Sequence, residues 1–344
     1  MPNQTIRPLL ENAREGYLFS AYQLAALHGT ERTSLAGGKT SYWPGASAVD
    51  ETTLFDIGSV TKAVVTVSLF ARALDSGRMA LTQAVQHWLP ELAGTALGPL
   101  VLSDLLSHAA GLRGWLPLYK QPIPADRRSW MAHAAGEWVE RPVGEKAVYS
   151  DLGFIILGEA VASAFHAPLA QAFRQEVAAP LGLTQTVYGP VPKAVATEVR
   201  EGVPLQGIVF DENCAALGGT AGHAGLFSTA LDLGRWAEAW LQAWQGKSPW
   251  LSQKTARLLT TRVGKVASSA WALGWDTPSA PSSSGNYFSS ESFGHLGYPG
   301  CSVWVDPKRG GYVVFLSNRV HPSRLDERIR RFRPQLHDAV TQAW

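Results

Sequence analysis

The hydrophobic residues of the chain change their spacing along the sequence, and each change marks a different kind of predicted structure. Near the N-terminus, residues 7–15 have the spacing of an amphipathic helix, and the apolar runs at 17–26 and 33–39 are typical of buried strands. Beyond residue 55 the spacing becomes helical, with little strand signal. The helices expected in this middle part cover residues 62–74, 84–89, 102–107 and 151–164.

Strand signal returns after Trp271, in short apolar runs separated by Gly, Pro and Ser. A closing helix is expected at 325–343, where Pro334 should kink or split it. The arginine-rich tract 328–333 should form the solvated face of that helix. The strands expected in this last part cover residues 272–275, 292–295, 302–305 and 312–317.

Strands at both ends of the chain predict one antiparallel sheet that the N- and C-terminal segments form together, interrupted by a helical insertion. The predicted fold class is therefore α/β in the broad sense (α+β), with a sheet flanked by helices. The sheet lobe should cover residues 1–56 and 266–344, and the mainly helical lobe residues 57–265. Together the two lobes should form one unit, with the functional cleft between them.

Composition and charge exclude several classes of function. The 344 residues are 46% hydrophobic and 17% charged, which is typical of a globular protein. Lys and Arg (30) nearly balance Asp and Glu (28), and a net charge of +2 argues against nucleic acid as a partner. Cys214 and Cys301 are too few for a disulfide framework. No group of residues has the ligand spacing of a metal site, so neither a metal nor an organic cofactor is expected.

The first residues predict where the protein is found. Charges at Arg7, Glu11 and Arg14 interrupt the apolar stretch that a secretory signal would need. The longest helical apolar stretch, at 63–74, is too short for a membrane span, which takes about 20 apolar residues. We therefore expect a cytoplasmic protein without a membrane span, unless a signal preceded this numbering. The sequence does not indicate an oligomeric state.

A serine and a lysine three positions apart, Ser59 and Lys62, begin the first long helical run. Positions i and i+3 share a helix face, so the lysine can meet the serine hydroxyl. A serine becomes a strong nucleophile when a neighbouring group takes its proton, and a lysine does so only if its pKa falls far below about 10.4. The alternative is an ordinary helix cap with an exposed lysine. No other lysine in the chain follows a serine at this spacing.

Two further motifs follow in order, namely Tyr149-Ser150-Asp151 and Gly294-His295-Leu296-Gly297. This order resembles the serine β-lactamase and penicillin-binding-protein superfamily, most closely its class C β-lactamase-like serine hydrolases, in which Ser-x-x-Lys, Tyr-x-Asn and a Lys- or His-x-Gly strand line one cleft. The stretches LLSHAAGL at 105–112 and GGTAGHAGLFST at 218–229 are also similar to family segments. The resemblance extends from about residue 17 to residue 320 and implies the β-lactamase/transpeptidase-like fold.

The resemblance also implies a role for each matching residue. Ser59 would be the nucleophile, Lys62 its activating partner, and Tyr149 the group that accepts and returns the proton. Asp151 and His295 would complete the catalytic residues. Leu296, Gly297 and Tyr298 would bind substrate, with the backbone N–H groups of Ser59 and Tyr298 forming the oxyanion hole. No cofactor or metal is implied.

Two departures from the family pattern bear on the substrate. Asp151 stands where many members have Asn, so a carboxylate that only accepts hydrogen bonds replaces an amide that can donate one. A carboxylate near Lys62 would favour the charged form of the lysine. In the simpler alternative, Asp151 only caps the following helix. His295-Leu296 replaces the Lys-Thr of β-lactamases. A protonated His295 could still steady Tyr149, with a charge that varies across physiological pH. Leu296 lacks the hydroxyl that would bind a substrate carboxylate.

These features predict a serine hydrolase that forms an acyl-enzyme on Ser59 and acts on a carboxylic ester or small amide. Two alternatives stay open: a D-alanyl-D-alanine-type peptidase or β-lactamase, and a catalytically weak binding or sensor protein of the same fold. Several neighbouring residues could line or brace the cleft. They are His108, Asp211, Glu212, His223, Trp271, Trp275 and Tyr287.

Overall fold

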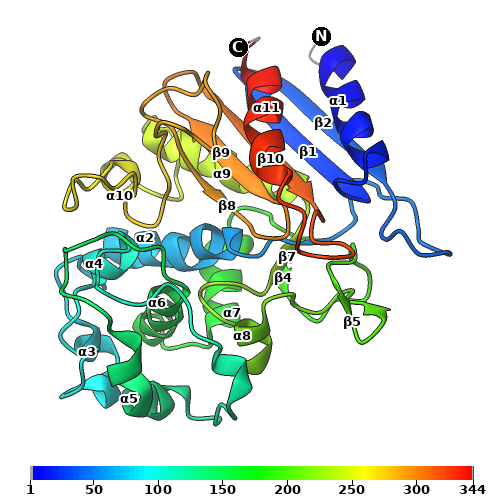
Figure 1. Cartoon of the computed structure of the whole chain (residues 1–344). Coiled ribbons are helices and arrows are strands. Elements are labelled where there is room, and N and C mark those ends of the chain that lie inside the picture. Colours follow the sequence, from blue (N-terminus) through cyan, green and yellow to red (C-terminus); the bar gives the residue numbers. More distant parts are fainter. Residues whose placement is uncertain (1–2, 343) are drawn as a thin grey trace.

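The computed structural model of the chain describes residues 3–342 and 344, and its largest sheet joins the two ends of the sequence (Figure 1). The sheet is antiparallel, with strand order β2-β1-β10-β9-β8. The N-terminal strand β1 pairs with β10 near the C-terminus, so that Leu24 lies opposite Phe315. The strands are β1 (Ala21–His28), β2 (Glu31–Gly38), β8 (Phe293–Leu296), β9 (Ser302–Asp306) and β10 (Gly311–Ser317).

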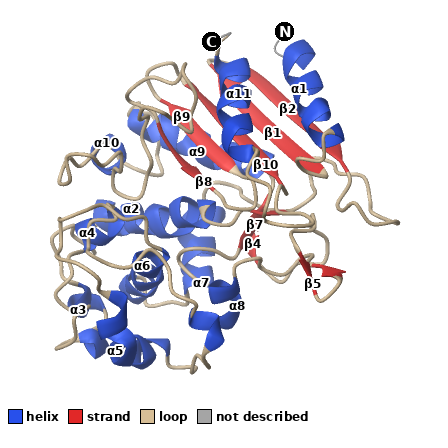
Figure 2. Ribbon diagram, in the orientation of Figure 1, coloured by secondary structure: helices blue, strands red, loops and turns tan. Residues whose placement is uncertain are grey.

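Helices cover both faces of this sheet, as Figure 2 shows. Because side chains alternate along a strand, Tyr22 and Leu24 of β1 pack in the cluster formed with α1 (Asn3–Glu15) and α11 (Ile329–Thr341). Ala25 belongs to the larger core on the opposite face, where α9 (Ala230–Trp244) contacts β1, β9 and β10. The sheet is therefore the middle layer of three.

Most of the remaining helices form a second body below the sheet in Figure 1, centred on the buried helix α6 (Asp151–Ala164), while α10 (Gln253–Thr260) contacts both α9 and α2. No single helix in the described part of the chain is long and apolar enough to cross a membrane; α6 and the segment 169–178 pass that test only as a pair, bent by 70°. The other helices are η1 (Lys62–Val67), α2 (Ser68–Asp75), α3 (Val85–Trp88), η2 (Pro90–Leu92), α4 (Leu102–Leu106), η3 (Leu118–Lys120), α5 (Arg127–Trp138), α7 (Leu169–Phe173), η4 (Arg174–Ala178) and α8 (Glu212–Ala216).

Short strands connect the two bodies. In the three-stranded sheet β3-β7-β4, strand β3 follows β2 in the chain and precedes η1. A separate hairpin, β5-β6, lies at the edge of the molecule (Figure 1). Their bounds are β3 (Phe55–Asp56), β4 (Val187–Tyr188), β5 (Val199–Arg200), β6 (Val203–Pro204) and β7 (Leu226–Ser228).

The mixed fold with an antiparallel sheet formed by both chain ends confirms the predicted fold class. The division into lobes at 56/57 and 265/266 stays a prediction. One helix departs from that division, because α9 lies within 57–265 and yet packs on the large sheet.

Three local predictions were wrong. Residues 272–275 form a tight turn instead of a strand, with Gly274 at a φ of +87° and the N–H of Ala272 donating to the carbonyl of Trp275. The first strand begins at Ala21 and not at Tyr17 as predicted, because Tyr17 lies in the turn that follows α1, with a φ of +58°. Of the kink or split expected at Pro334, the split is wrong, because α11 continues through Pro334 while its apolar residues hold it on the sheet.

The predicted solvated face at 328–333 was also partly wrong. Arg331 is exposed, as expected, but Arg333 is only 6% exposed. The helix turns Arg333 inward, toward the end of β8.

Candidate active site

The turn that carries Ser59 is held from both sides. The buried Asp56 at the end of β3 accepts hydrogen bonds from the N–H groups of Gly58 (2.8 Å) and Phe210 (2.7 Å). Burial raises the pKa of Asp56 to about 6, against these two hydrogen bonds. Gly58 has a φ of +52°, and a side chain there would meet Pro299 at 2.5 Å. The backbone before Ser59 is thus fixed against both the Phe210 segment and the Pro299 loop.

Lys62 lies fully buried beneath Ser59, which excludes the alternative of an exposed lysine after a helix cap. Its Nζ donates to Ser59 Oγ (2.9 Å), Asp151 Oδ1 (2.6 Å) and the carbonyl of His223 (3.2 Å). Three acceptors match the three protons of an ammonium group. Burial lowers the pKa of Lys62, but the Asp151 carboxylate and Tyr149 outweigh it, so the pKa is raised. The resting Lys62 is therefore a cation that donates to Ser59.

The carboxylate of Asp151 forms an ion pair with Lys62 and does not cap the following helix. Ser150 is the cap of α6, because its Oγ accepts the N–H of Gly153 at 3.2 Å. Asp151 is the first helical residue, and its side chain is 16% exposed where it meets Lys62. The charged lysine expected from this aspartate is what the geometry shows.

Tyr149 lies over the lysine, with its ring centre 4.9 Å from Lys62 Nζ. The rings of His108 (4.8 Å) and Trp271 (5.4 Å) hold it in place. Burial raises the pKa of Tyr149, and Asp151 adds to this, although Lys62 and the hydrogen bond with Ser59 work to lower it. Because Lys62 stays protonated, the phenol is the group next to Ser59 that can accept its proton once it is ionised.

Replacing Asp151 by asparagine is expected to move the acid limb of the pH profile of kcat/KM to lower pH. Without the carboxylate, the pKa values of both Lys62 and Tyr149 fall, since Asp151 raises both. A neighbouring charge at contact distance shifts a pKa by roughly 1–3 units. The acid limb reports the ionisation of Tyr149, so we expect it to move by about one pH unit. The profile of kcat/KM between pH 5 and 10 measures it. A limb that stays in place or moves to higher pH would contradict this role of Asp151.

His295, on β8, faces the same cluster, with its ring centre 6.1 Å from that of Tyr149. Its Nδ1 lies 2.8 Å from the carbonyl of Leu296, which places the ring proton on that nitrogen. Burial, together with the nearby Lys62, lowers the pKa of His295 to about 3. The expected charge change across physiological pH is therefore wrong, because desolvation keeps the imidazole neutral there.

The pH midpoints of the reaction should accordingly not depend on His295. Replacing it by glutamine is expected to change kcat but to leave the midpoints of the profile between pH 5 and 8 within about half a unit, since a neutral group contributes no titration in this range. The comparison uses the same buffer series for both proteins. Loss of an inflection near pH 6.5 in the variant would show that His295 does titrate.

Two backbone N–H groups, those of Ser59 and Tyr298, belong to segments that pack against each other beside the nucleophile. Strand β8 ends against the nucleophile turn so closely that a side chain on Gly297 would lie 2.3 Å from the carbonyl of Ile57. A side chain on Gly58 would lie 3.4 Å from the nitrogen of Tyr298. In the described residues, neither N–H donates to another backbone carbonyl. The pair is thus available to an oxyanion, as the resemblance implied.

All the site residues expected from the sequence, except the buried Lys62, line one cleft of about 800 Å³. The cleft has an aromatic wall, an acidic corner and a basic side. The aromatic residues are Trp115, Phe210, Trp271 and Tyr298, the acidic ones Asp211, Glu212 and Asp276, and the basic ones Arg319, Arg324, Arg330 and Arg333. Sequence patterns did not indicate the basic side, since its residues were assigned to solvent or not assigned.

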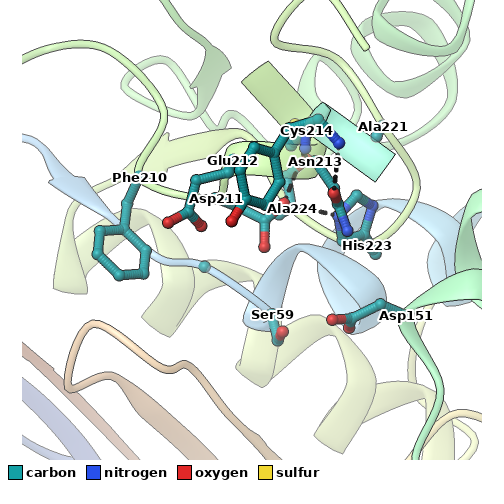
Figure 3. Close-up of polar contacts among 12 residues, drawn as sticks. Ser59, Asp151, Phe210, Asp211, Glu212, Asn213, Cys214, Ala221, His223 and Ala224 are labelled. Carbon is teal, nitrogen blue, oxygen red and sulfur yellow. Dashed lines mark hydrogen bonds and ion pairs between the residues drawn. The ribbon is translucent and has the colours of Figure 1, made fainter. Parts of the chain in front are cut away.

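The acidic corner contains a pair formed by a buried histidine and a partly exposed aspartate (Figure 3). His223 Nε2 lies 3.0 Å from Asp211 Oδ1, and Asp211 also accepts the N–H of Cys214 at 2.7 Å as the cap of α8. Burial works to raise the pKa of Asp211, but His223 and the cap hydrogen bond lower it to about 2. Since the carbonyl of His223 accepts from Lys62, the pair braces the loop beside Ser59, as expected for His223.

Of the other residues predicted to line or brace the cleft, His108 braces it, whereas Trp275 and Tyr287 lie outside it. His108 braces the Tyr149 segment, because its Nδ1 accepts the N–H of Ser150 at 3.1 Å. Trp275 does not line the cleft; it is fully buried and stacks on Trp236 with ring centres 5.5 Å apart. Tyr287 is 41% exposed and lies outside the cleft. In the residues that the structure describes, no group of three or more His, Cys, Asp and Glu side chains could hold a metal ion.

A serine hydroxyl hydrogen-bonded to a buried ammonium, beside a phenol and two free N–H groups, defines a protein of the serine hydrolase class. The chain belongs to the beta-lactamase family, whose model matches residues 5–337. This confirms the resemblance seen in the three motifs.

Relatives and solved structures agree with this membership. The chain is 28% identical over 305 residues to an Escherichia coli (strain K12) protein named "Putative D-alanyl-D-alanine carboxypeptidase", covering 78% of this chain and 70% of that protein. It is 29% identical over 310 residues to the N-acetylmuramyl-L-alanine amidase of Bacillus subtilis (strain 168), covering 80% and 70% of the two chains.

The fold is shared with proteins of low sequence identity. A class C beta-lactamase superposes with a TM-score of 0.79 at 16% identity, over 100% of this chain and 98% of the other. EstCE1, described as a hydrolase with promiscuous acyltransferase activity, superposes with a TM-score of 0.75 at 21% identity, over 99% and 98%. These likenesses support the fold, while the substrate must be inferred from the cleft.

Proposed function

We propose that the protein hydrolyses a carboxylic ester or small amide through an acyl-enzyme on Ser59. The observation that carries the proposal is the hydroxyl of Ser59, which lies 2.9 Å from the Lys62 ammonium and lines one cleft with Tyr298, whose N–H donates to no backbone carbonyl of the described residues. A hydroxyl in this position can attack a carbonyl whose oxygen the two N–H groups stabilise.

The proton movements follow from the charges in the site. Although burial raises the pKa of Tyr149, its minor phenolate form is stabilised by the Lys62 cation and accepts the proton of Ser59 while Oγ bonds to the substrate carbonyl carbon. The phenol then returns this proton to the leaving alcohol or amine as its bond to the carbonyl carbon breaks. In the second half, Tyr149 takes a proton from water, the water oxygen bonds to the acyl carbon, and Ser59 leaves with that proton.

The substrate class is argued from the walls of the cleft. Leu296 offers no hydroxyl to a carboxylate, which favours a neutral acyl compound. The apolar lining formed by Trp115 and Trp271 suits an acyl or aryl group in the same cleft.

A second candidate, a peptidase for short peptides that end in a carboxylate, is supported by Arg330 and Arg333 on the basic side of the cleft. The names of the carboxypeptidase and amidase relatives favour it too. The third candidate, a binding or sensor protein, would use the same cleft without turnover.

A substrate panel distinguishes the candidates. p-Nitrophenyl acetate and butyrate, a D-Ala-D-Ala peptide and the cephalosporin nitrocefin are each incubated with the protein, and product release is followed. Faster turnover of the esters supports the proposal, and preferred release of D-alanine supports the peptidase. Fast hydrolysis of nitrocefin would contradict the inference from Leu296, and inertness toward all four, with binding intact, would favour the sensor. The cytoplasmic location remains a prediction.

A further inference from the structure

Arg333 of α11 is a buried cation without an anionic partner. Its Nη2 donates to the carbonyl of Gly297 at 2.6 Å, and its Nε is buried without a hydrogen-bond partner. No ion pair of the described residues includes it. Burial lowers the pKa of Arg333 to about 10, so the guanidinium is still charged at neutral pH. A buried charge that costs stability and has no carboxylate partner points to a use in the site.

The carbonyl that Arg333 binds belongs to the same peptide group as the N–H of Tyr298. A trans peptide is planar, and its C=O and N–H point in opposite directions. The carbonyl of Gly297 also accepts the N–H of Gly300 at 3.1 Å, so both of its lone pairs are used on the side away from Ser59. Fixing the carbonyl on one side therefore fixes the N–H on the other, where the oxyanion forms.

A cation on a carbonyl oxygen also polarises the peptide. Hydrogen bonds in a chain strengthen one another, and the effect is larger where the local dielectric constant is low. The peptide N–H of Tyr298 becomes a stronger donor when the oxygen of the same peptide group is bound by a guanidinium. This strengthening matters most when the acceptor is an oxyanion, since charged acceptors form the stronger bonds.

We propose that Arg333 is a positioning residue of the oxyanion hole, which orients and polarises the Gly297–Tyr298 peptide from the side of that peptide opposite the oxyanion. The proposal rests on the proposed acyl-enzyme at Ser59. If Arg333 bound a substrate carboxylate, its loss would affect only substrates that carry one. The role proposed here predicts that its loss slows the hydrolysis of uncharged substrates as well.

The test compares Arg333→Met and Arg333→Lys with wild type, using neutral p-nitrophenyl butyrate. Loss of a direct oxyanion donor costs roughly 10²- to 10³-fold in kcat, so loss of its support is expected to cost about 10- to 100-fold, with KM within about twofold. The affinity for phenylboronic acid, which forms a tetrahedral adduct with a serine, should fall by the same factor as kcat. Arg333→Lys, which retains the charge, should recover part of both. Arg331→Gln, on the exposed face of α11, is the matched control and should behave as wild type.

Several results would overturn the proposal. One is a folded Arg333→Met enzyme with wild-type kcat and boronic acid affinity. Another is a loss confined to the KM of carboxylate-bearing peptides, which would assign Arg333 to substrate binding. If the Met variant does not fold, Arg333→Gln decides, since wild-type kcat in that uncharged variant contradicts the proposal. Failure of the acyl-enzyme mechanism is recognised separately, by wild-type turnover in Ser59→Ala.

Discussion

Replacing Ser59 by alanine is expected to lower ester hydrolysis by a factor of roughly 10⁴ or more, because no acyl-enzyme can form without the hydroxyl. The remaining site should stay in place, since Lys62 retains Asp151 and the carbonyl of His223 as acceptors. The free energy of unfolding should change by only about 1 kcal/mol, as for the loss of one hydrogen bond. Product release from p-nitrophenyl butyrate measures the rate.

Mass spectrometry of the protein after brief exposure to the ester gives the second readout. Wild type should gain the mass of one butyryl group on the peptide that contains Ser59, and the variant should gain none. Ser268→Ala, which removes an exposed serine after α10, is the control and should retain full activity. Turnover that persists in Ser59→Ala would disprove the nucleophile and the mechanism that depends on it.

Replacing Tyr149 by phenylalanine is expected to lower kcat by roughly 10²- to 10⁴-fold, the usual contribution of a general acid and base. The ring should keep its place between His108 and Trp271, because the variant loses only the hydroxyl. KM should therefore change little. The variant should also lose the part of the pH profile that the phenol sets, which the dependence of kcat/KM on pH would show.

A buried tyrosine that does not line the cleft provides the control. Tyr22 donates to Glu11 Oε1 at 2.5 Å beneath α1, so Tyr22→Phe removes a buried, hydrogen-bonded hydroxyl that is not part of the cleft lining. This control should lose stability without a change in kcat. A Tyr149→Phe enzyme with wild-type kcat would instead assign the proton transfer to another group, with Lys62 the nearest.

The charges of the site were the least predictable part from the sequence. The Asp151 that replaces the family's Asn already indicated a charged Lys62, but only the folded protein shows that burial of the lysine is outweighed by its contact with Asp151, at 2.6 Å. The reason is that a pKa depends on burial and on neighbours from other elements. His295 shows the same point, since the desolvation that keeps it neutral comes from packing between β8 and the helices.

The sequence by itself determined the fold class, the order of the motifs and the residues that meet at the cleft. Hydrophobic spacing is local and therefore predicted the fold class, whereas the meeting of the Ser-x-x-Lys, Tyr-Ser-Asp and His-Leu-Gly motifs followed from their resemblance to the family. Only the tertiary structure decided that 272–275 is a turn, that Arg333 lies inside, and that it binds the Gly297–Tyr298 peptide. These depend on which face of α11 meets the end of β8, a contact between elements that no local pattern records.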